Sequence, residues 1–193
     1  MADGEVSELS AHESWCHYLL PEARTIIDIG GQDAKVIRLD WQGFMSSFVM
    51  NDKCVAGTGR FLDVMAGILK IDAGALGKLA VQSSNLVSIS STCTVFAESE
   101  VISQLASGAE TLDIVAGICE SVAARVAALA HRVGVQETVF FSGGVSCNDG
   151  VRHALEQALR VPVATDPLAP LAGALGAAIY AYQTAGKEAS KNG

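Results

Sequence analysis

Two pairs of adjacent glycines, each close behind a short apolar segment, constrain the fold of this chain most. Gly30-Gly31 follows residues 25–29, and Gly143-Gly144 follows residues 138–142. Apolar segments bounded by glycine are typical of strands, and glycine lets backbone N–H groups approach phosphate oxygens closely. The two turns could therefore meet around one nucleotide at the crevice of an α/β sheet. An ordinary tight hairpin is the simpler explanation of the first pair.

Two glycine-containing segments, the first turn and Gly57-Thr58-Gly59, do not match a standard nucleotide-binding motif. The first turn is not a Walker A loop, and Gly57-Thr58-Gly59 lacks the third glycine of a dinucleotide-binding motif. Asp28 stands inside the first apolar segment, where a buried carboxylate is costly unless it is solvated, paired or close to a cation. The pattern around Asp28 therefore favours a polar or cationic neighbour.

Apolar periodicity predicts the remaining elements. The clearest helix covers residues 112–133, with an apolar stripe at spacings of three and four, and Gly134 ends it. Asn148 or Asp149 can cap the helix that follows. Further strands are predicted over residues 34–39, 43–50 and 161–164. Further helices are predicted over residues 6–20 and 170–182 and from about 93 to Gly108, and two more begin at about residue 59 and at residue 149.

Composition excludes several classes of partner. The 193 residues carry thirteen Lys and Arg against twenty-one Asp and Glu, a formal net charge of −8. No basic patch stands out, so neither nucleic acid nor an anionic membrane is an expected partner. We find no secretory signal, and the longest apolar stretch, residues 168–182, is interrupted by Pro170, Gly173 and Gly176. These features predict a cytoplasmic protein.

Five cysteines, an odd number without a CxxC pair, do not resemble a secreted disulfide framework. Cys54 and Cys93 each precede a predicted amphipathic helix, with Ala97, Val101 and Leu105 expected on the buried face of the second. A helix N-terminus favours a thiolate, so both positions suit something anionic, although small thiols are often simply buried. Cys16 falls on the first predicted helix and is expected to be a small buried residue. Cys119 lies in the apolar stripe of the clearest helix and is expected in the core, and Cys147 is interpreted as structural or incidental.

Long motifs in this sequence resemble the BadF/BadG/BcrA/BcrD ATPase family, which includes the activators of 2-hydroxyacyl-CoA dehydratases. The motifs are Ile-Asp-Ile-Gly-Gly-Gln-Asp-Ala-Lys at 27–35, Asn-Asp-Lys-Cys-Val-Ala-Gly-Thr-Gly-Arg-Phe at 51–61, Cys-Thr-Val-Phe-Ala-Glu-Ser-Glu at 93–100, Phe-Ser-Gly-Gly-Val at 141–145 and Gly-Ala-Leu-Gly-Ala-Ala at 173–178. The resemblance covers essentially residues 5–182.

The resemblance implies an α/β fold of the ribonuclease-H-like, actin-like ATPase type, with a mixed sheet and flanking helices. ATP and Mg would then be bound by Asp28, Gly30, Gly31 and Gln32 and by Gly143 and Gly144. Cys54 and Cys93 match the cysteines that ligate iron, and two from each chain of a homodimer would hold one [4Fe–4S] cluster. This assignment implies that the Gly57-Thr58-Gly59 segment belongs to the cluster and not to the nucleotide.

The function implied is that of an ATPase coupled to electron transfer. An electron from ferredoxin or flavodoxin would pass through the cluster to a dehydratase at low potential, in an anaerobic host. The catalytic residue for hydrolysis is not evident from the sequence. The expected organisation is a helix remaining from the first actin-like domain at 1–22, the second domain at 23–186 and a tail at 187–193.

Three alternatives stay open. The chain could be the ATPase subunit of a benzoyl-CoA reductase-type enzyme, or a small-molecule kinase of the same fold, such as an amino-sugar kinase. It could also be a truncated dimerisation module that does not hydrolyse ATP, because the first-domain Asp-x-Gly-Ser hairpin that supplies the other phosphate clamp is absent from the sequence.

Overall fold

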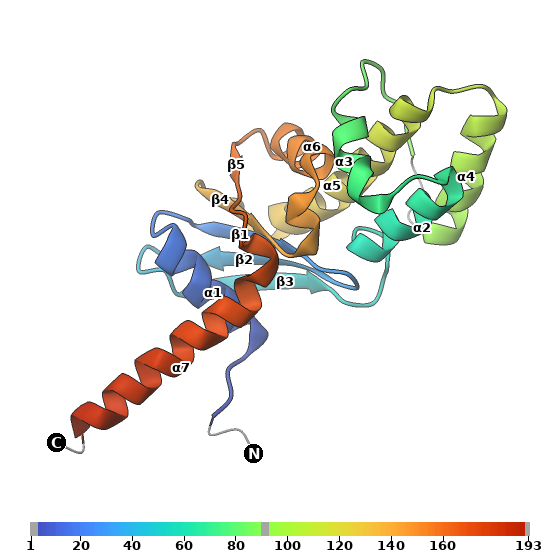
Figure 1. Ribbon diagram of the computed structural model, residues 1–193. Helices are drawn as coiled ribbons and strands as arrows, with labels where there is room; N and C mark the ends of the chain where they lie inside the picture. Colours follow the sequence, from blue (N-terminus) through green and yellow to red (C-terminus); the bar gives the residue numbers. More distant parts are fainter. Residues whose placement is uncertain (1–3, 90–92, 192–193) are drawn as a thin grey trace.

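The computed structural model describes residues 4–89 and 93–191, which form a five-stranded mixed sheet between two helical layers (Figure 1). The spatial order of the strands is β3-β2-β1-β4-β5, with β1 antiparallel to β2 and parallel to β4. This arrangement confirms the α/β prediction. The strands are β1 (Thr25–Ile29), β2 (Ala34–Leu39), β3 (Met45–Asn51), β4 (Val139–Ser142) and β5 (Val163–Ala164).

Helices cover both faces of this sheet. The long helix α5 packs against β2 and β3, and α6 packs against α5 and β5 (Figure 1). The helices α1 and α7 pack against each other on the opposite face. The helices α2 and α4 lie beyond the sheet, away from α7. The α-helices are α1 (Glu8–Leu19), α2 (Gly59–Leu69), α3 (Leu76–Ala80), α4 (Thr94–Ala106), α5 (Thr111–Val133), α6 (Asp149–Leu159) and α7 (Ala172–Lys191), and the 3-10 turns are η1 (Ala73–Ala75), η2 (Gly144–Cys147) and η3 (Ala169–Leu171).

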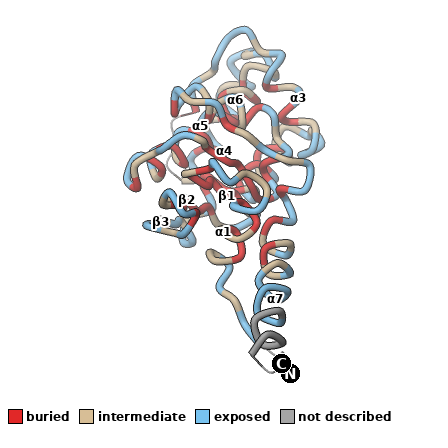
Figure 2. Tube along the Cα trace, turned by 90° about the vertical axis from the view of Figure 1, so that its left-hand side faces the viewer, coloured by how far each residue is buried: buried red, intermediate tan, exposed pale blue. Residues whose placement is uncertain are grey.

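The alternation of side chains along β1 produces two hydrophobic cores. Ile27 and Ile29 pack into the larger core beneath α5 and α6, whereas Ile26 packs with Trp15 of α1 on the other face. A strand buried on both faces need not alternate apolar with polar residues, so β1 carries three isoleucines beside its buried polar residues Thr25 and Asp28. Figure 2 shows the buried residues concentrated in the body, with residues 180–185 of α7 exposed.

Local sequence signals account for several element ends. The bounds of β1 and β2 match their predicted ranges, and Gly134 ends α5 as predicted. The side chain of Asn148 accepts a hydrogen bond of 3.0 Å from the amide of Val151, so Asn148 is the cap of α6. No helix within the described ranges is both long and apolar enough to cross a membrane.

Three predictions of local structure are wrong. The side chain of Leu105 is exposed, because only Ala97 and Val101 of α4 reach the core. The last helix continues to Lys191 instead of ending at Tyr182. Cys54 lies five residues before α2, whose cap is Thr58, whereas Cys93 is itself the cap of α4. The two cysteines therefore do not share one local design.

Candidate functional site

The parallel pairing of β1 with β4 brings the two glycine turns together. Asp28 lies opposite Ser142 in the register, so the turns that follow both strands leave the same edge of the sheet. Gly143 has a φ of 83°, and a Cβ atom there would lie 2.4 Å from the carbonyl oxygen of Ile29. Only glycine fits between the strands at this point.

The start of α2 contributes a third segment to the same place. The amides of Gly59 and Arg60 donate hydrogen bonds of 2.9 and 2.8 Å to the carbonyl oxygens of Gly30 and Gly31. A Cβ atom on Gly59 would lie 3.1 Å from the Gly30 oxygen and 3.3 Å from Val145 Cγ2. The backbone of α2 thus rests directly on the first glycine turn and lies beside Val145, which follows the second.

These three segments line a cavity of about 350 Å³, together with η1 and the start of α6. Gly30, Gly31 and Gly144 are in its wall, and Gly143 lies directly before the wall residue Gly144. Gln32 is exposed at the turn and does not line the cavity. The remaining wall residues are Gly59, Leu62, Asp63, Ala73, Gly74, Val145, Cys147 and Asn148.

The Gly57-Thr58-Gly59 segment was predicted to belong to the cysteine site and not to the nucleotide site. Because Gly59 lines this cavity, that separation is too strict. A second cavity, of about 490 Å³, lies among α3, α5 and α6, and its wall mixes small apolar with polar side chains. It contains no residue of either glycine turn, so the smaller cavity is the better candidate for a nucleotide.

Asp28 is buried beneath the turns, outside the cavity wall, and has the polar neighbours that its position demanded. Its Oδ1 accepts a hydrogen bond of 2.8 Å from Ser142 Oγ and lies 3.6 Å from His12 Nδ1. Its Oδ2 lies 3.5 Å from Lys35 Nζ. The carboxylate is only 3% exposed, so these neighbours replace the solvent that it has lost.

Sequence reasoning missed Glu8 and His12, which join Asp28 in a group of potential cation ligands. One ligand atom from each of these residues lies within 4.8 Å of the others. The spacing of four residues places Glu8 and His12 on one face of α1, and that spacing was the available signal. His12 Nδ1 is buried and has no hydrogen-bond partner among the described residues.

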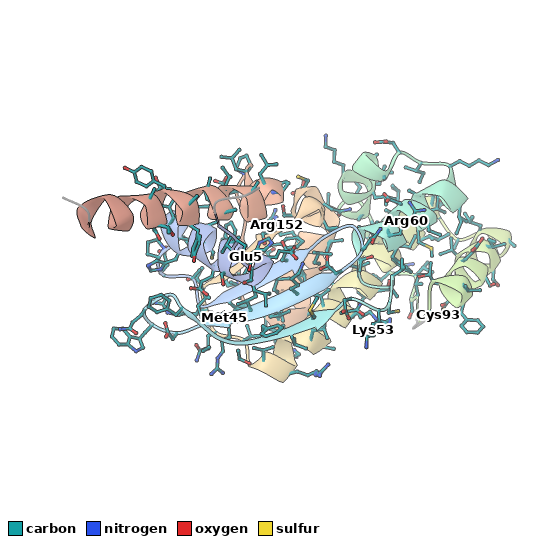
Figure 3. All side chains as sticks on the ribbon, turned by 90° about the horizontal axis from the view of Figure 1, so that it is seen from below. Glu5, Met45, Lys53, Arg60, Cys93 and Arg152 are labelled. Atoms are coloured by element: carbon teal, nitrogen blue, oxygen red, sulfur yellow. The ribbon has the colours of Figure 1, made fainter. Side chains whose placement is uncertain are left out.

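The predicted iron ligands lie away from the free end of α7. Figure 3 shows Cys93 at the end of the molecule opposite α7, with Lys53, the neighbour of Cys54, toward the same end. Cys54 and Cys93 are both half-buried, and α2 contacts α4. Residues 90–92 of the predicted Ser/Thr-rich turn before Cys93 lie outside the described residues.

Asn51 fixes the backbone around Cys54. Its side chain donates hydrogen bonds to the carbonyl oxygens of Cys54 and Ala56, at 2.8 and 3.2 Å, and accepts one from the Cys54 amide at 3.2 Å. Thr58 Oγ1 closes the turn by donating to the carbonyl of Val55 at 2.7 Å. These hydrogen bonds hold the backbone of Cys54 in a defined turn.

The other three cysteines differ in their accessibility. Burial raises the pKa of the Cys119 thiol to about 12, and burial with the charge of Glu22 raises the pKa of Cys16 to about 12. Both are core residues, as predicted. Cys147 is exposed and lines the cavity, so its position is not incidental.

Comparison with known proteins places these features in one family. The chain is 56% identical over 187 residues to the (R)-2-hydroxyglutaryl-CoA dehydratase activating ATPase of Acidaminococcus fermentans, covering 97% of this chain and 72% of that protein. It is 51% identical over 187 residues to the activator of lactoyl-CoA dehydratase of Anaerotignum propionicum, covering 97% and 72%.

A solved structure has the same architecture. The activator of the 2-hydroxyisocaproyl-CoA dehydratase from Clostridium difficile, with bound ADPNP, superposes with a TM-score of 0.95 at 54% identity, covering 100% of this chain and 71% of that one. The fold is therefore the actin-like ATPase fold that the sequence motifs implied. The BadF/BadG/BcrA/BcrD ATPase family model matches residues 1–181, and the chain belongs to this family.

Proposed function

We propose that this chain is an ATP-dependent reductive activator of a 2-hydroxyacyl-CoA dehydratase, which receives its electron from ferredoxin or flavodoxin. The observation that carries the proposal is that Gly30, Gly31, Gly59 and Gly144 line one and the same cavity, next to a segment that bears Cys54. Support comes from a relative with bound ADPNP and nearly the same backbone. The ATPase subunit of a benzoyl-CoA reductase-type enzyme is the alternative from within the family.

The nucleotide phosphates would bind at the two glycine turns. Gly144 and Gly31 have open space where a Cβ atom would stand, so their backbone can approach an anion closely. Asp28 and Gln32 flank the first glycine turn without lining the cavity, and they are the proposed partners of the associated Mg ion, since carboxylate and amide oxygens suit this cation. The neighbouring Glu8 adds a further carboxylate to this side of the site.

Cys54 and Cys93 fit the proposed role of iron ligands. Both cysteines are half-buried: Cys93 is the cap of α4, and Cys54 lies in the turn five residues before α2, which contacts α4. No disulfide joins any of the five cysteines, all of which lie in the described ranges. Two thiolates per chain satisfy half of a [4Fe–4S] cluster, so a homodimer would supply four. The bound cluster would supply one-electron redox chemistry at a potential sensitive to its hydrogen bonds and charge.

The chain's own residues would couple the two sites. Gly59 and Arg60 donate backbone hydrogen bonds to Gly30 and Gly31, so a movement of the phosphate turn would pull on the start of α2. The turn around Cys54 leads directly into that helix. We propose that nucleotide binding and hydrolysis alter the surroundings of the cysteines by this route.

The chain spans 72% and 71% of two of its relatives, and this partial coverage supports the proposed domain organisation. We propose that residues 1–22, including α1, connect to a first actin-like domain, and that residues 23–186 form the second. A complete nucleotide site would then need the first phosphate clamp from outside the sequence described.

Anaerobic reconstitution followed by iron and sulfide analysis tests the cluster. We expect four irons per dimer in the wild-type chain, and loss of the cluster's visible absorbance in Cys54→Ala and Cys93→Ala. Cys147→Ala is the matched control, because that thiol is exposed and lies in the other site. Equal iron content in all four proteins would refute the assignment of the ligands.

Calorimetric titration with ADPNP tests the nucleotide site. Gly144→Val would fill the cavity without a backbone clash, and we expect it to weaken binding by at least ~10-fold, or ~1.4 kcal/mol. Phosphorylation of a sugar by the purified protein, without cluster assembly, would instead favour the kinase alternative.

A further inference from the structure

Lys35 is the centre of a charged network, and the proposed function assigns no role to this lysine. It stands near the start of β2 and is 1% exposed, which is unusual for a lysine. Its ammonium group contacts carboxylates from three segments: Glu8 of α1 at 2.9 Å, Asp28 of β1 at 3.5 Å, and Asp33, with which it also forms an ion pair. A buried ammonium group is tolerated when it is paired in this way.

Lys35 remains charged in this environment. Burial by itself would lower the pKa of Lys35, but the hydrogen bonds to Asp33 and Glu8 and the charge of Asp28 more than offset it and hold that pKa above its ordinary value of 10.5. The network is therefore a fixed electrostatic contact at neutral pH. Its strength does not depend on proton uptake by the lysine.

The carboxylates of Asp28 and Asp33 flank the first glycine turn. Asp28 precedes Gly30 by two residues, and Asp33 closes the turn, where its carbonyl oxygen accepts a hydrogen bond of 3.0 Å from the Gly30 amide. Both carboxylates are drawn to the same ammonium group. Lys35 thus holds the two ends of the turn whose Gly30 and Gly31 line the cavity.

The third partner lies on a different element. Glu8 is in the first turn of α1, which packs against α7 across the sheet from α5 (Figure 1). Its side chain is 61% exposed, and its Oε1 reaches two buried groups, Lys35 Nζ at 2.9 Å and His12 Nε2 at 3.8 Å. Any displacement of the start of α1 therefore changes the electrostatic balance at the turn.

We propose that Lys35 is a positioning residue for the nucleotide phosphates, and that the Glu8–Lys35 pair makes phosphate affinity depend on the position of α1. Lys35 does not touch the cavity and acts through Asp28 and Asp33. The inference rests on the proposed function, because it assumes that the phosphates bind at the Gly30-Gly31 turn.

The test compares a ligand with phosphates to one without them. Dissociation constants for ADPNP and for adenosine are measured by calorimetry, with competition where binding is weak, in the wild type, Lys35→Met and Lys35→Arg. We expect Lys35→Met to weaken ADPNP binding by at least ~10-fold while adenosine affinity stays within ~2-fold, and Lys35→Arg to recover a large part of the loss. A parallel loss of both ligands, or no loss of either, would overturn the proposal.

Glu8→Gln keeps the proposal testable if Lys35→Met fails to fold. The substitution is at an exposed side chain, and we expect it to weaken ADPNP binding by ~3- to 10-fold with no effect on adenosine. Glu5→Gln is the matched control, since it removes the same charge three residues earlier at an exposed position and should leave both affinities unchanged. Equal affinities in Glu8→Gln and Glu5→Gln would contradict the coupling to α1.

Trp15 provides an optical readout of α1. It is buried on that helix, whereas Trp41 is exposed, so a Trp41→Phe background leaves one tryptophan signal. We expect ADPNP to change the Trp15 emission, and Glu8→Gln to remove most of that change at saturating ligand. A wild type that binds neither ligand would refute the proposed function, whereas an unaltered Trp15 response in Glu8→Gln would refute only this inference.

Discussion

The backbone amide of Gly59 donates a hydrogen bond of 2.9 Å to the carbonyl oxygen of Gly30. This contact joins the start of α2 to the turn between β1 and β2. The segment that carries Cys54 and the segment proposed to bind phosphate therefore share one rigid junction. A movement of the turn between β1 and β2 can therefore be transmitted to the Cys54 segment through this hydrogen bond and the few residues between Cys54 and Gly59.

Substitution at Gly59 tests this junction. In Gly59→Ala the new methyl group would lie 3.1 Å from the Gly30 oxygen, so the turn must shift by a few tenths of an ångström. We expect ADPNP affinity to fall by ~3- to 10-fold and stability by about 1 kcal/mol. Calorimetric titration and urea unfolding measure the two effects.

Gly67→Ala is the control on the same helix. A Cβ atom at Gly67 meets nothing within 4 Å, and alanine is the better helix former, so stability should rise by about 0.5–1 kcal/mol with unchanged ADPNP affinity. A loss of affinity in Gly67→Ala as large as that in Gly59→Ala would show that α2 acts through its stability and not through the junction.

Gly143 and Gly144 make a second matched pair. Gly143→Ala requires a positive φ of 83° and places a Cβ atom 2.4 Å from the Ile29 oxygen, whereas Gly144→Ala meets nothing within 4 Å. We expect Gly143→Ala to lower the free energy of unfolding by more than about 2 kcal/mol, and Gly144→Ala by less than about 0.5 kcal/mol. Similar urea midpoints for both variants would contradict this packing of β1 against the second turn.

Cys147 reports on occupancy of the cavity. It is exposed and lines the wall, while burial raises the pKa of both Cys16 and Cys119 to about 12. Because the thiolate is the reactive form, we expect an alkylating reagent at pH 8 to modify Cys147 and to spare the two core thiols. ADPNP should slow the modification of Cys147 several-fold, as measured by peptide mass spectrometry. Unchanged labelling with saturating ADPNP would place the nucleotide elsewhere.

The ionisation of Glu13 should make the free energy of unfolding depend on pH. Burial raises the pKa of Glu13 above its ordinary value of 4.5, partly offset by the hydrogen bond that its carboxylate accepts from the Met45 amide. The folded state then binds the Glu13 proton more tightly than the unfolded state, so ionisation of this group opposes folding at neutral pH and not at low pH.

Glu13→Gln removes that cost and keeps an acceptor for the Met45 amide. We expect the variant to be more stable at pH 7 by less than about 1 kcal/mol, and the gain to disappear below about pH 4, where Glu13 is protonated in both states. Thermal unfolding across this range measures the difference. A gain of equal size at pH 3 and pH 7 would exclude ionisation of Glu13 as its cause.

Much of the fold is readable from short-range patterns. The apolar residues of β1 and β2, the helical stripe of α5 and the cap at Asn148 follow from periodicity and side-chain capping within a few residues. The resemblance of longer motifs to a known family extended the prediction from single elements to the actin-like fold. The same local reasoning failed at Leu105, because the stripe of α4 continues past the point where the helix leaves the core.

Sequence patterns alone singled out the residues that we propose for the two sites: the two glycine pairs, Asp28 and the cysteines before α2 and α4. Only the tertiary structure decided which of them meet. Asp28 and Ser142 are 114 positions apart and touch because β1 and β4 are neighbours in the sheet. Glu8 and His12 reach Asp28 because α1 packs over the sheet, and Lys35 reaches it as its cross-strand neighbour on β2. Local periodicity sets an element and its faces, but contacts between elements depend on strand order and packing, which no short segment encodes.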